Sequence, residues 1–152
     1  MTANSTDTAD RQHWMAVLAK AEPEHLELLH EQLDLESGYR LIRPPENGLV
    51  MVRARAGGTG RQFNFGEATV TRCTLATEAG FVGQAYILGR NQRHAMLAAL
   101  MDARLNDPAT RGIVIDTVIR PLETEYRQRK SAQAARVAAT KVDFFTMVRG
   151  ET

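Results

Sequence analysis

A glycine-rich loop beside three arginines is the first stretch of this sequence that could carry chemistry. The loop is Gly57-Gly58-Thr59-Gly60, and the arginines are Arg53, Arg55 and Arg61. Backbone N–H groups and guanidinium groups arranged in this way can wrap a phosphate. The loop does not match the phosphate-binding motif of nucleotide hydrolases, however, and no helix clearly follows it. The pattern therefore favours a flexible hairpin turn that needs positive φ at glycine, with anion binding as the alternative.

A second basic group lies at the expected start of a helix. Arg90, Arg93 and His94 cluster there, where free N–H groups and the helix dipole favour anions. Arg90 and His94 are four residues apart and would share a helix face. We predict an anion or ligand contact through these two residues, while a solvated polar first turn is the alternative that the pattern alone favours.

The remaining reactive residues form no recognisable set. No Gly-x-Ser-x-Gly or His-Glu-x-x-His motif occurs. The other histidines, His13, His25 and His30, lack metal-ligand spacing on one helix face and are interpreted as surface or boundary residues. The single cysteine, Cys73, excludes an internal disulfide, and its place within an expected strand favours a buried thiol. We therefore predict no metal site, and the catalytic residues stay unknown.

Composition places few restrictions on function. The chain has 152 residues and a net charge of +1, from 19 basic and 18 acidic side chains. This balance gives no electrostatic reason to expect nucleic acid or an anionic membrane as a partner. The first ten residues lack the features of a signal peptide, and the longest clean apolar run, Ala95 to Met101, is far shorter than the roughly 20 residues that span a bilayer. A cytoplasmic protein is expected.

Most of the β-signal lies between Gly48 and Arg90. Strands are predicted over residues 48–56, 67–77 and 81–88, with Thr77-Glu78-Ala79-Gly80 as a hairpin loop. A short strand over residues 39–43 would be turned back into this ribbon by Pro44-Pro45-Glu46-Asn47-Gly48. Residues 112–119 are β-branched and favour either a last strand or a short helix. We expect a sheet of about four to five antiparallel strands.

Helical patterns flank the ribbon on both sides. Helices are predicted from Arg11 to about Lys20, from Pro23 with a stripe of Leu26, Leu29 and Leu33, from Asn91 to Leu105, and from Pro121 onward. The fold class is therefore α+β, with the sheet flanked by an N-terminal helical hairpin and C-terminal helices. Residues 1–8 are predicted to be disordered, and residues 9–150 to form one domain.

The C-terminal part of that domain, residues 121–150, is predicted to be a helix followed by an apolar docking segment. Residues 142–148 contain five apolar side chains in seven positions. Such surface is costly in water and should be covered. The predicted partner-binding residues are Phe144, Phe145, Met147, Val148 and Arg149. The alternative, which stays open, is that the segment fills the core of its own domain.

Several short segments occur in an order that resembles one known family. They are Arg11-Gln-His-Trp-Met15, Arg55-Ala-Gly-Gly-Thr-Gly60, Thr71-Arg72, Gly89-Arg90 with His94-Ala95, Asp102-Ala103, Pro121-Leu122 and Lys141-Val-Asp-Phe-Phe-Thr-Met-Val-Arg-Gly150. This order resembles the PhnG family, the G subunit of the bacterial carbon–phosphorus lyase system. The resemblance runs from about residue 9 to residue 150, and the last segment is its most specific part.

The resemblance implies a cytoplasmic role in phosphonate use. In that system the G subunit acts with the H, I and L subunits to make α-D-ribose 1-methylphosphonate 5-triphosphate from ATP and methylphosphonate, releasing adenine. The G, H, I and J subunits form a stable core complex. No cofactor is expected on this subunit alone, since ATP and methylphosphonate are substrates of the complex. Two hypotheses follow: a non-catalytic assembly subunit, or a direct binder or transferase for nucleotide or phosphonate.

Overall fold

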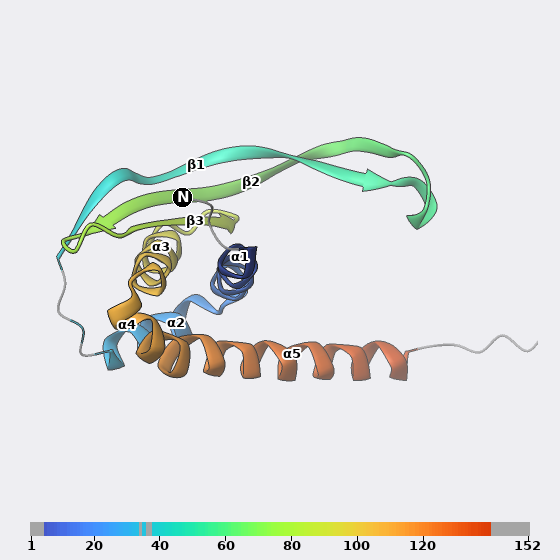
Figure 1. Cartoon of the computed structure of the whole chain (residues 1–152). Coiled ribbons are helices and arrows are strands. Elements are labelled where there is room, and N and C mark those ends of the chain that lie inside the picture. Colours follow the sequence, from blue (N-terminus) through green and yellow to red (C-terminus); the bar gives the residue numbers. More distant parts are fainter. Residues whose placement is uncertain (1–4, 34, 36–37, 141–152) are drawn as a thin grey trace, which may run out of the picture.

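The computed structural model describes residues 5–33, 35 and 38–140, which form a three-stranded sheet and several helices. The helices lie on one side of the sheet (Figure 1). The elements in chain order are α1 (Ser5–Lys20), α2 (Pro23–Gln32), β1 (Tyr39–Arg55), the 3₁₀ turn η1 (Ala56–Gly58), β2 (Gln62–Thr77), β3 (Val82–Leu88), α3 (Gln92–Asn106), α4 (Pro108–Val114), the π-helical turn η2 (Ile115–Ile119) and α5 (Arg120–Ala139). Helices α1 and α3 lie directly beneath the sheet, and α5 runs along the side away from it. The predicted α+β class is confirmed.

The sheet has the order β1-β2-β3 and is antiparallel throughout. Three strands form it within the described residues, rather than the four to five predicted. The main reason is that residues 39–43 and 48–55 belong to one strand. The chain passes Pro44 and Pro45 through register shifts between Leu41 and Glu46, and pairing with β2 resumes at Glu46. The two prolines therefore act as an irregularity in an edge strand and not as a turn.

Residues 112–119 are helical, so the strand alternative for them is wrong. They lie within α4 and η2, which lead directly into α5. Their β-branched side chains Val114, Val118 and Ile119 are buried in the hydrophobic core. Packing of these side chains therefore overrides their preference for extended backbone.

The first helix begins at Ser5, six residues before the predicted start at Arg11. The second ends at Gln32, and its predicted stripe of Leu26, Leu29 and Leu33 is buried as expected. The third runs from Gln92 to Asn106, close to its predicted bounds. The last helix spans Arg120–Ala139 and buries only Leu122.

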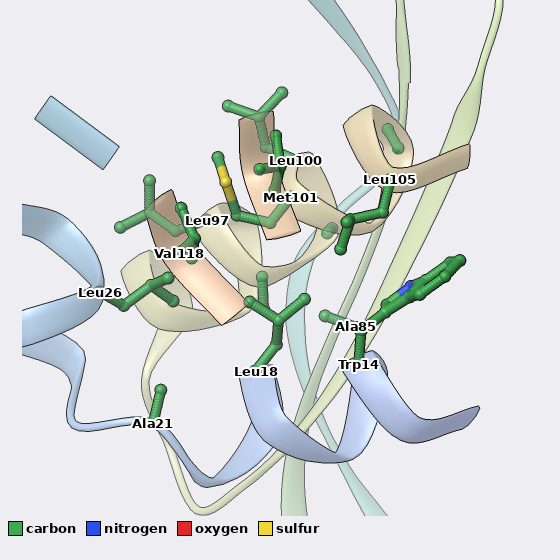
Figure 2. Close-up of a cluster of buried hydrophobic side chains, with 14 of the residues drawn as sticks. Trp14, Leu18, Ala21, Leu26, Ala85, Leu97, Leu100, Met101, Leu105 and Val118 are labelled. Atoms are coloured by element: carbon green, nitrogen blue, oxygen red, sulfur yellow. The ribbon is translucent and has the colours of Figure 1, made fainter. Parts of the chain in front are cut away.

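The core lies between the sheet and the helices (Figure 2). Trp14 and Leu18 of α1 and Met101 of α3 are buried in it, together with Ala85 of β3. At Gly83 of β3, an added Cβ would lie 1.9 Å from the Ala99 carbonyl oxygen, so α3 packs directly on the strand backbone. Cys73 of β2 is buried as predicted, and burial raises the pKa of its thiol.

Strands β1 and β2 continue as a pair beyond the end of β3. The ladder between β2 and β3 covers residues 70–76 of β2, whereas β2 pairs with β1 as far as Gln62. We call residues 49–69 the arm. In Figure 1 it projects past the end of β3 and past α1. The rest of the described chain, with the core, is called the body.

Candidate functional site

The predicted glycine-rich loop forms the tip of the arm. Gly57 and Gly58 have φ of 58° and 80°, which confirms the prediction of a turn that needs positive φ. The Gly60 N–H donates to the Ala56 carbonyl oxygen at 2.8 Å, closing the turn. Arg55 Nη1 donates to the Gly60 carbonyl oxygen at 3.3 Å. The loop is thus an exposed hairpin turn, and anion binding through Gly57, Gly58, Thr59 and Gly60 stays a prediction.

The two residues of the second predicted site lie in different environments. Arg90 is exposed just before α3. His94 is 4% exposed, and its Nε2 lies 2.8 Å from the Leu18 carbonyl oxygen. Since a carbonyl oxygen only accepts, Nε2 carries the proton and donates it. Burial lowers the pKa of His94, so the imidazole is held neutral between α1 and α3. The structure therefore does not bring Arg90 and His94 together on one open face.

The first turn of α3 is held by a small polar cluster around Thr71. The Thr71 hydroxyl donates to the Gly89 carbonyl oxygen at 2.7 Å and accepts from the Asn91 N–H at 3.0 Å. It also lies 3.0 Å from the side-chain amide of Asn47 on β1. Asn91 in turn caps α3 by accepting from the His94 N–H at 2.9 Å. The cluster ties the base of the arm to the helix start, so its polar groups serve the fold.

A fully buried carboxylate, Asp102 of α3, is the largest polar feature that the sequence did not reveal. It accepts from Arg11 Nε and Nη2 at 3.2 and 2.8 Å and from Trp14 Nε1 at 2.9 Å. It also accepts from the backbone N–H of Gln84 at 2.9 Å. These four bonds join α1, α3 and β3. Because a carboxylate offers about four lone-pair positions, Asp102 has none left for acid–base chemistry.

Asp102 and its partners include residues that carry the family resemblance. Arg11 and Trp14 come from the first of those segments, and Asp102 comes from another. The available signal was a charged side chain within the apolar stripe of a predicted helix. A buried charge needs a partner, but periodicity does not say which of the arginines supplies it.

A hollow of about 410 Å³ lies between α1 and α5. Its titratable residues are His13, Lys20, Glu123, Tyr126 and Arg127. The His13 imidazole contacts the Glu123 carboxylate, and Lys20 Nζ lies 5.3 Å from the centre of the Tyr126 ring. No serine, threonine or cysteine lines the hollow to act as a nucleophile. It is a surface groove with a mainly apolar lining, bordered by charged side chains.

The described residues contain no group of three or more His, Cys, Asp or Glu side chains able to hold a metal ion. In the same part of the chain, no helix is long and apolar enough to cross a membrane. The predicted partner-binding residues Phe144, Phe145, Met147, Val148 and Arg149 lie outside the described residues.

The fold and these polar clusters define a small α+β protein with a projecting two-stranded arm and an Arg–Asp–Trp node around a buried carboxylate. Residues 9–150 match the family model described as "Phosphonate metabolism protein PhnG". The chain therefore belongs to the PhnG family, which confirms the resemblance.

A curated relative from Rhizobium meliloti (strain 1021) is 41% identical over 153 residues. The matched region covers 99% of this chain and 96% of the relative. That relative is named α-D-ribose 1-methylphosphonate 5-triphosphate synthase subunit PhnG.

Proposed function

We propose that this chain is a subunit of α-D-ribose 1-methylphosphonate 5-triphosphate synthase and that it helps to assemble the complex without supplying catalytic groups. The synthase role rests on family membership and on the name of the 41% identical relative. The non-catalytic role rests on one structural observation: the buried side chains of Asp102, His94 and Thr71, which could do chemistry, are engaged in bonds that hold the fold together.

Three residues carry that observation. The Asp102 carboxylate is fully used by Arg11, Trp14 and the sheet backbone. The His94 imidazole is held by a main-chain carbonyl, and Thr71 by the start of α3. A general acid or base must instead be able to reach substrate.

The partners that the family resemblance implies are the H, I and L subunits during synthesis, and H, I and J in a stable core complex. The reaction of the whole complex would consume ATP and methylphosphonate and release adenine. In this proposal those substrates are bound by partner subunits, this chain carries no cofactor, and the complex works in the cytoplasm.

A second function is favoured by one specific observation at the tip of the arm. Arg53 and Arg61 are exposed and form no ion pair with the described carboxylates. Beside the glycine turn, they could hold a nucleotide or phosphonate and make the chain a direct binding or transfer subunit.

The two functions are separated by reconstitution. Adenine release from ATP and methylphosphonate is measured with the full set of synthase subunits, without this chain, and with this chain alone. We expect activity only with the full set. Suppose that the isolated chain turned over ATP and methylphosphonate, and that a point substitution in this chain abolished the turnover. That result would disprove the non-catalytic role.

A second experiment is calorimetric titration of the isolated chain with ATP, which we expect to show no binding. If the wild-type chain bound ATP and an Arg53→Ala/Arg61→Ala variant did not, the result would support the second function.

A further inference from the structure

The arm exposes an unusual amount of apolar surface. Its large exposed apolar side chains are Leu49, Val50, Met51, Val52, Phe63 and Phe65, with exposed fractions from 36% at Val50 to 73% at Phe65. Neighbouring strand residues point to opposite faces, so both faces of the ribbon are apolar. The rings of Phe63 and Phe65 pack edge to face at 6.4 Å, and both remain exposed. Large exposed apolar side chains that gather in one element in this way mark an interaction site.

In the part of the chain that the structure describes, the backbone of the arm is also open along both edges. There β1 pairs with β2 alone, and residues 62–68 of β2 lie beyond the last backbone bond to the β3 side, from the Gly89 N–H to the Thr69 carbonyl oxygen. Proteins normally protect such edges with prolines, charges or a covering element. In this chain Pro44 and Pro45 interrupt the edge at the base, but the arm contains no proline. A two-stranded ribbon alone is marginally stable in water.

The charge of the arm differs from that of the body. The arm carries Arg53, Arg55 and Arg61, and its single acidic residue is Glu67 near the base. In the body, by contrast, arginines are widely paired: Arg93 with Glu27, Arg129 with Glu22, and Arg120 with Asp116. The described carboxylates form no ion pair with the three arginines of the arm. The described part of the chain therefore does not neutralise their positive charge.

Building on the proposed function, we propose that the arm inserts into a groove on another subunit of the synthase, and that the groove has apolar walls and carboxylates that meet Arg53, Arg55 and Arg61. The open strand edges would pair with backbone of the partner, as in β-strand addition. Met51 and Phe65 would enter its apolar pockets and act as anchors. The arginines would set orientation through complementary charge.

Charge and shape argue against the two other occupants. Two copies of this chain paired arm to arm would bring six arginines together with only two acidic residues on the arms to offset them. Nucleic acid would meet three arginines but would leave the exposed faces of Met51 and Phe65 uncovered. A protein groove satisfies the edges, the apolar faces and the charge together.

The test is co-purification of a tagged full-length chain with the other synthase subunits, all expressed together. Met51→Asp/Phe65→Asp should lower the recovered partner subunits by more than about tenfold, since loss of one or two apolar anchors costs at least that factor. Arg61→Glu should lower recovery as well, with a larger effect at low salt than at high salt.

Matched controls come from the body. Leu28 of α2 and Val137 of α5 are 56% and 63% exposed, close to the 52% of Met51 and the 73% of Phe65, so the double variant Leu28→Asp/Val137→Asp introduces the same two charges at similar exposure. Arg136 of α5 is exposed and has no ion pair with a described carboxylate, so Arg136→Glu matches Arg61→Glu. Both controls should keep wild-type recovery. The isolated full-length arm variants should keep the wild-type melting temperature, since the altered side chains are exposed.

The outcomes distinguish this inference from the proposed function. Failure of the wild-type chain to recover any synthase subunit would overturn the proposed function itself. Wild-type recovery by the arm variants would overturn the arm inference alone. A wild-type dimer in light scattering that the arm substitutions dissociate, with partner recovery unchanged, would assign the arm to a second copy. If the wild-type chain bound phosphate or ATP and the arm variants lost that binding while partner recovery stayed unchanged, the arm would be assigned to a ligand. Either result would also overturn the inference.

Discussion

The inner and outer halves of β2 belong to one strand but differ in their burial and in the number of neighbouring strands. From Val70 to Thr77 the strand lies between β1 and β3 and buries Cys73 and Leu75 against the helices. From Gln62 to Phe65 it has one neighbouring strand, and its aromatic side chains are exposed. Apolar residues occur in both halves. Apolar content alone therefore does not mark a core: among the described residues, the inner half is covered by β3 and the helices, and the outer half is not.

The largest effect that would test this comparison is expected from the buried node of the body. Asp102→Ala removes the acceptor of three side-chain bonds and one backbone bond, leaving Arg11, Trp14 and Gln84 without it. Breaking a buried charged pair costs about 3–5 kcal/mol, and because Arg11 is partly exposed we expect a loss of about 3 kcal/mol. The free energy of unfolding is measured in urea.

Asp116→Ala is the control for this substitution, because Asp116 pairs with Arg120 where both side chains are largely exposed. Its effect should stay below about 1 kcal/mol. Equal losses for the two variants would show that the Asp102 node does not hold the body together.

A smaller effect is expected from two glycines that contrast the body and the arm. A Cβ at Gly83 would lie 1.9 Å from the Ala99 carbonyl oxygen and 2.4 Å from the Ala103 nitrogen, both backbone atoms of α3. Gly83→Ala should therefore destabilise the chain by about 1–3 kcal/mol as α3 moves off the sheet.

At Gly66 in the arm nothing lies within 4 Å of the added Cβ. Gly66→Ala should change stability by less than about 0.5 kcal/mol. Thermal unfolding of both variants measures the contrast, and a large loss at Gly66 would show that the arm is packed in the isolated chain.

The smallest effect concerns pH. Burial lowers the pKa of His94 below its usual value of 6.5, and burial together with Arg104 and Arg93 lowers that of His30. A group with a lowered folded-state pKa binds its proton more weakly in the native state than in the unfolded state. Its contribution to stability is present above pH 6.5 and is lost as the pH falls below that value. The midpoint of urea unfolding should drop between pH 7.5 and pH 5, and the drop should shrink in His94→Gln. A midpoint that is constant over this range would contradict the buried neutral imidazole.

Local patterns predicted the elements whose packing follows from one face. The stripe of Leu26, Leu29 and Leu33 specified α2, the apolar run from Ala95 to Met101 specified α3, and Gly80 specified the hairpin between β2 and β3. In these cases the side-chain period or the turn residue acts within a few residues. The family resemblance supplied the functional class.

Local patterns do not predict contacts between segments that are distant in the sequence. The pairing of Asp102 with Arg11 spans 91 residues, and the burial of His94 depends on a carbonyl 76 residues away. The histidine was therefore assigned to a ligand face although it lies in the core. The turn predicted at Pro44 and Pro45 is absent for a different reason. An edge strand tolerates a residue without an N–H, whereas the same residue would end an interior strand. Residues 112–119 became helical because burial of Val114 and Val118 outweighed their strand propensity.

The single cysteine has a consequence for how opening of the sheet could be followed. Cys73 sits opposite Ala85 in the β2–β3 ladder, is 1% exposed, and has a pKa raised by burial. A thiol reagent attacks the thiolate and needs access to the sulfur, so it must wait until β2 separates from the helices or from β3. The rate of that single alkylation event therefore reports transient separation of β2 from β3 or from the helices within the body, and it does not respond to motion of the arm.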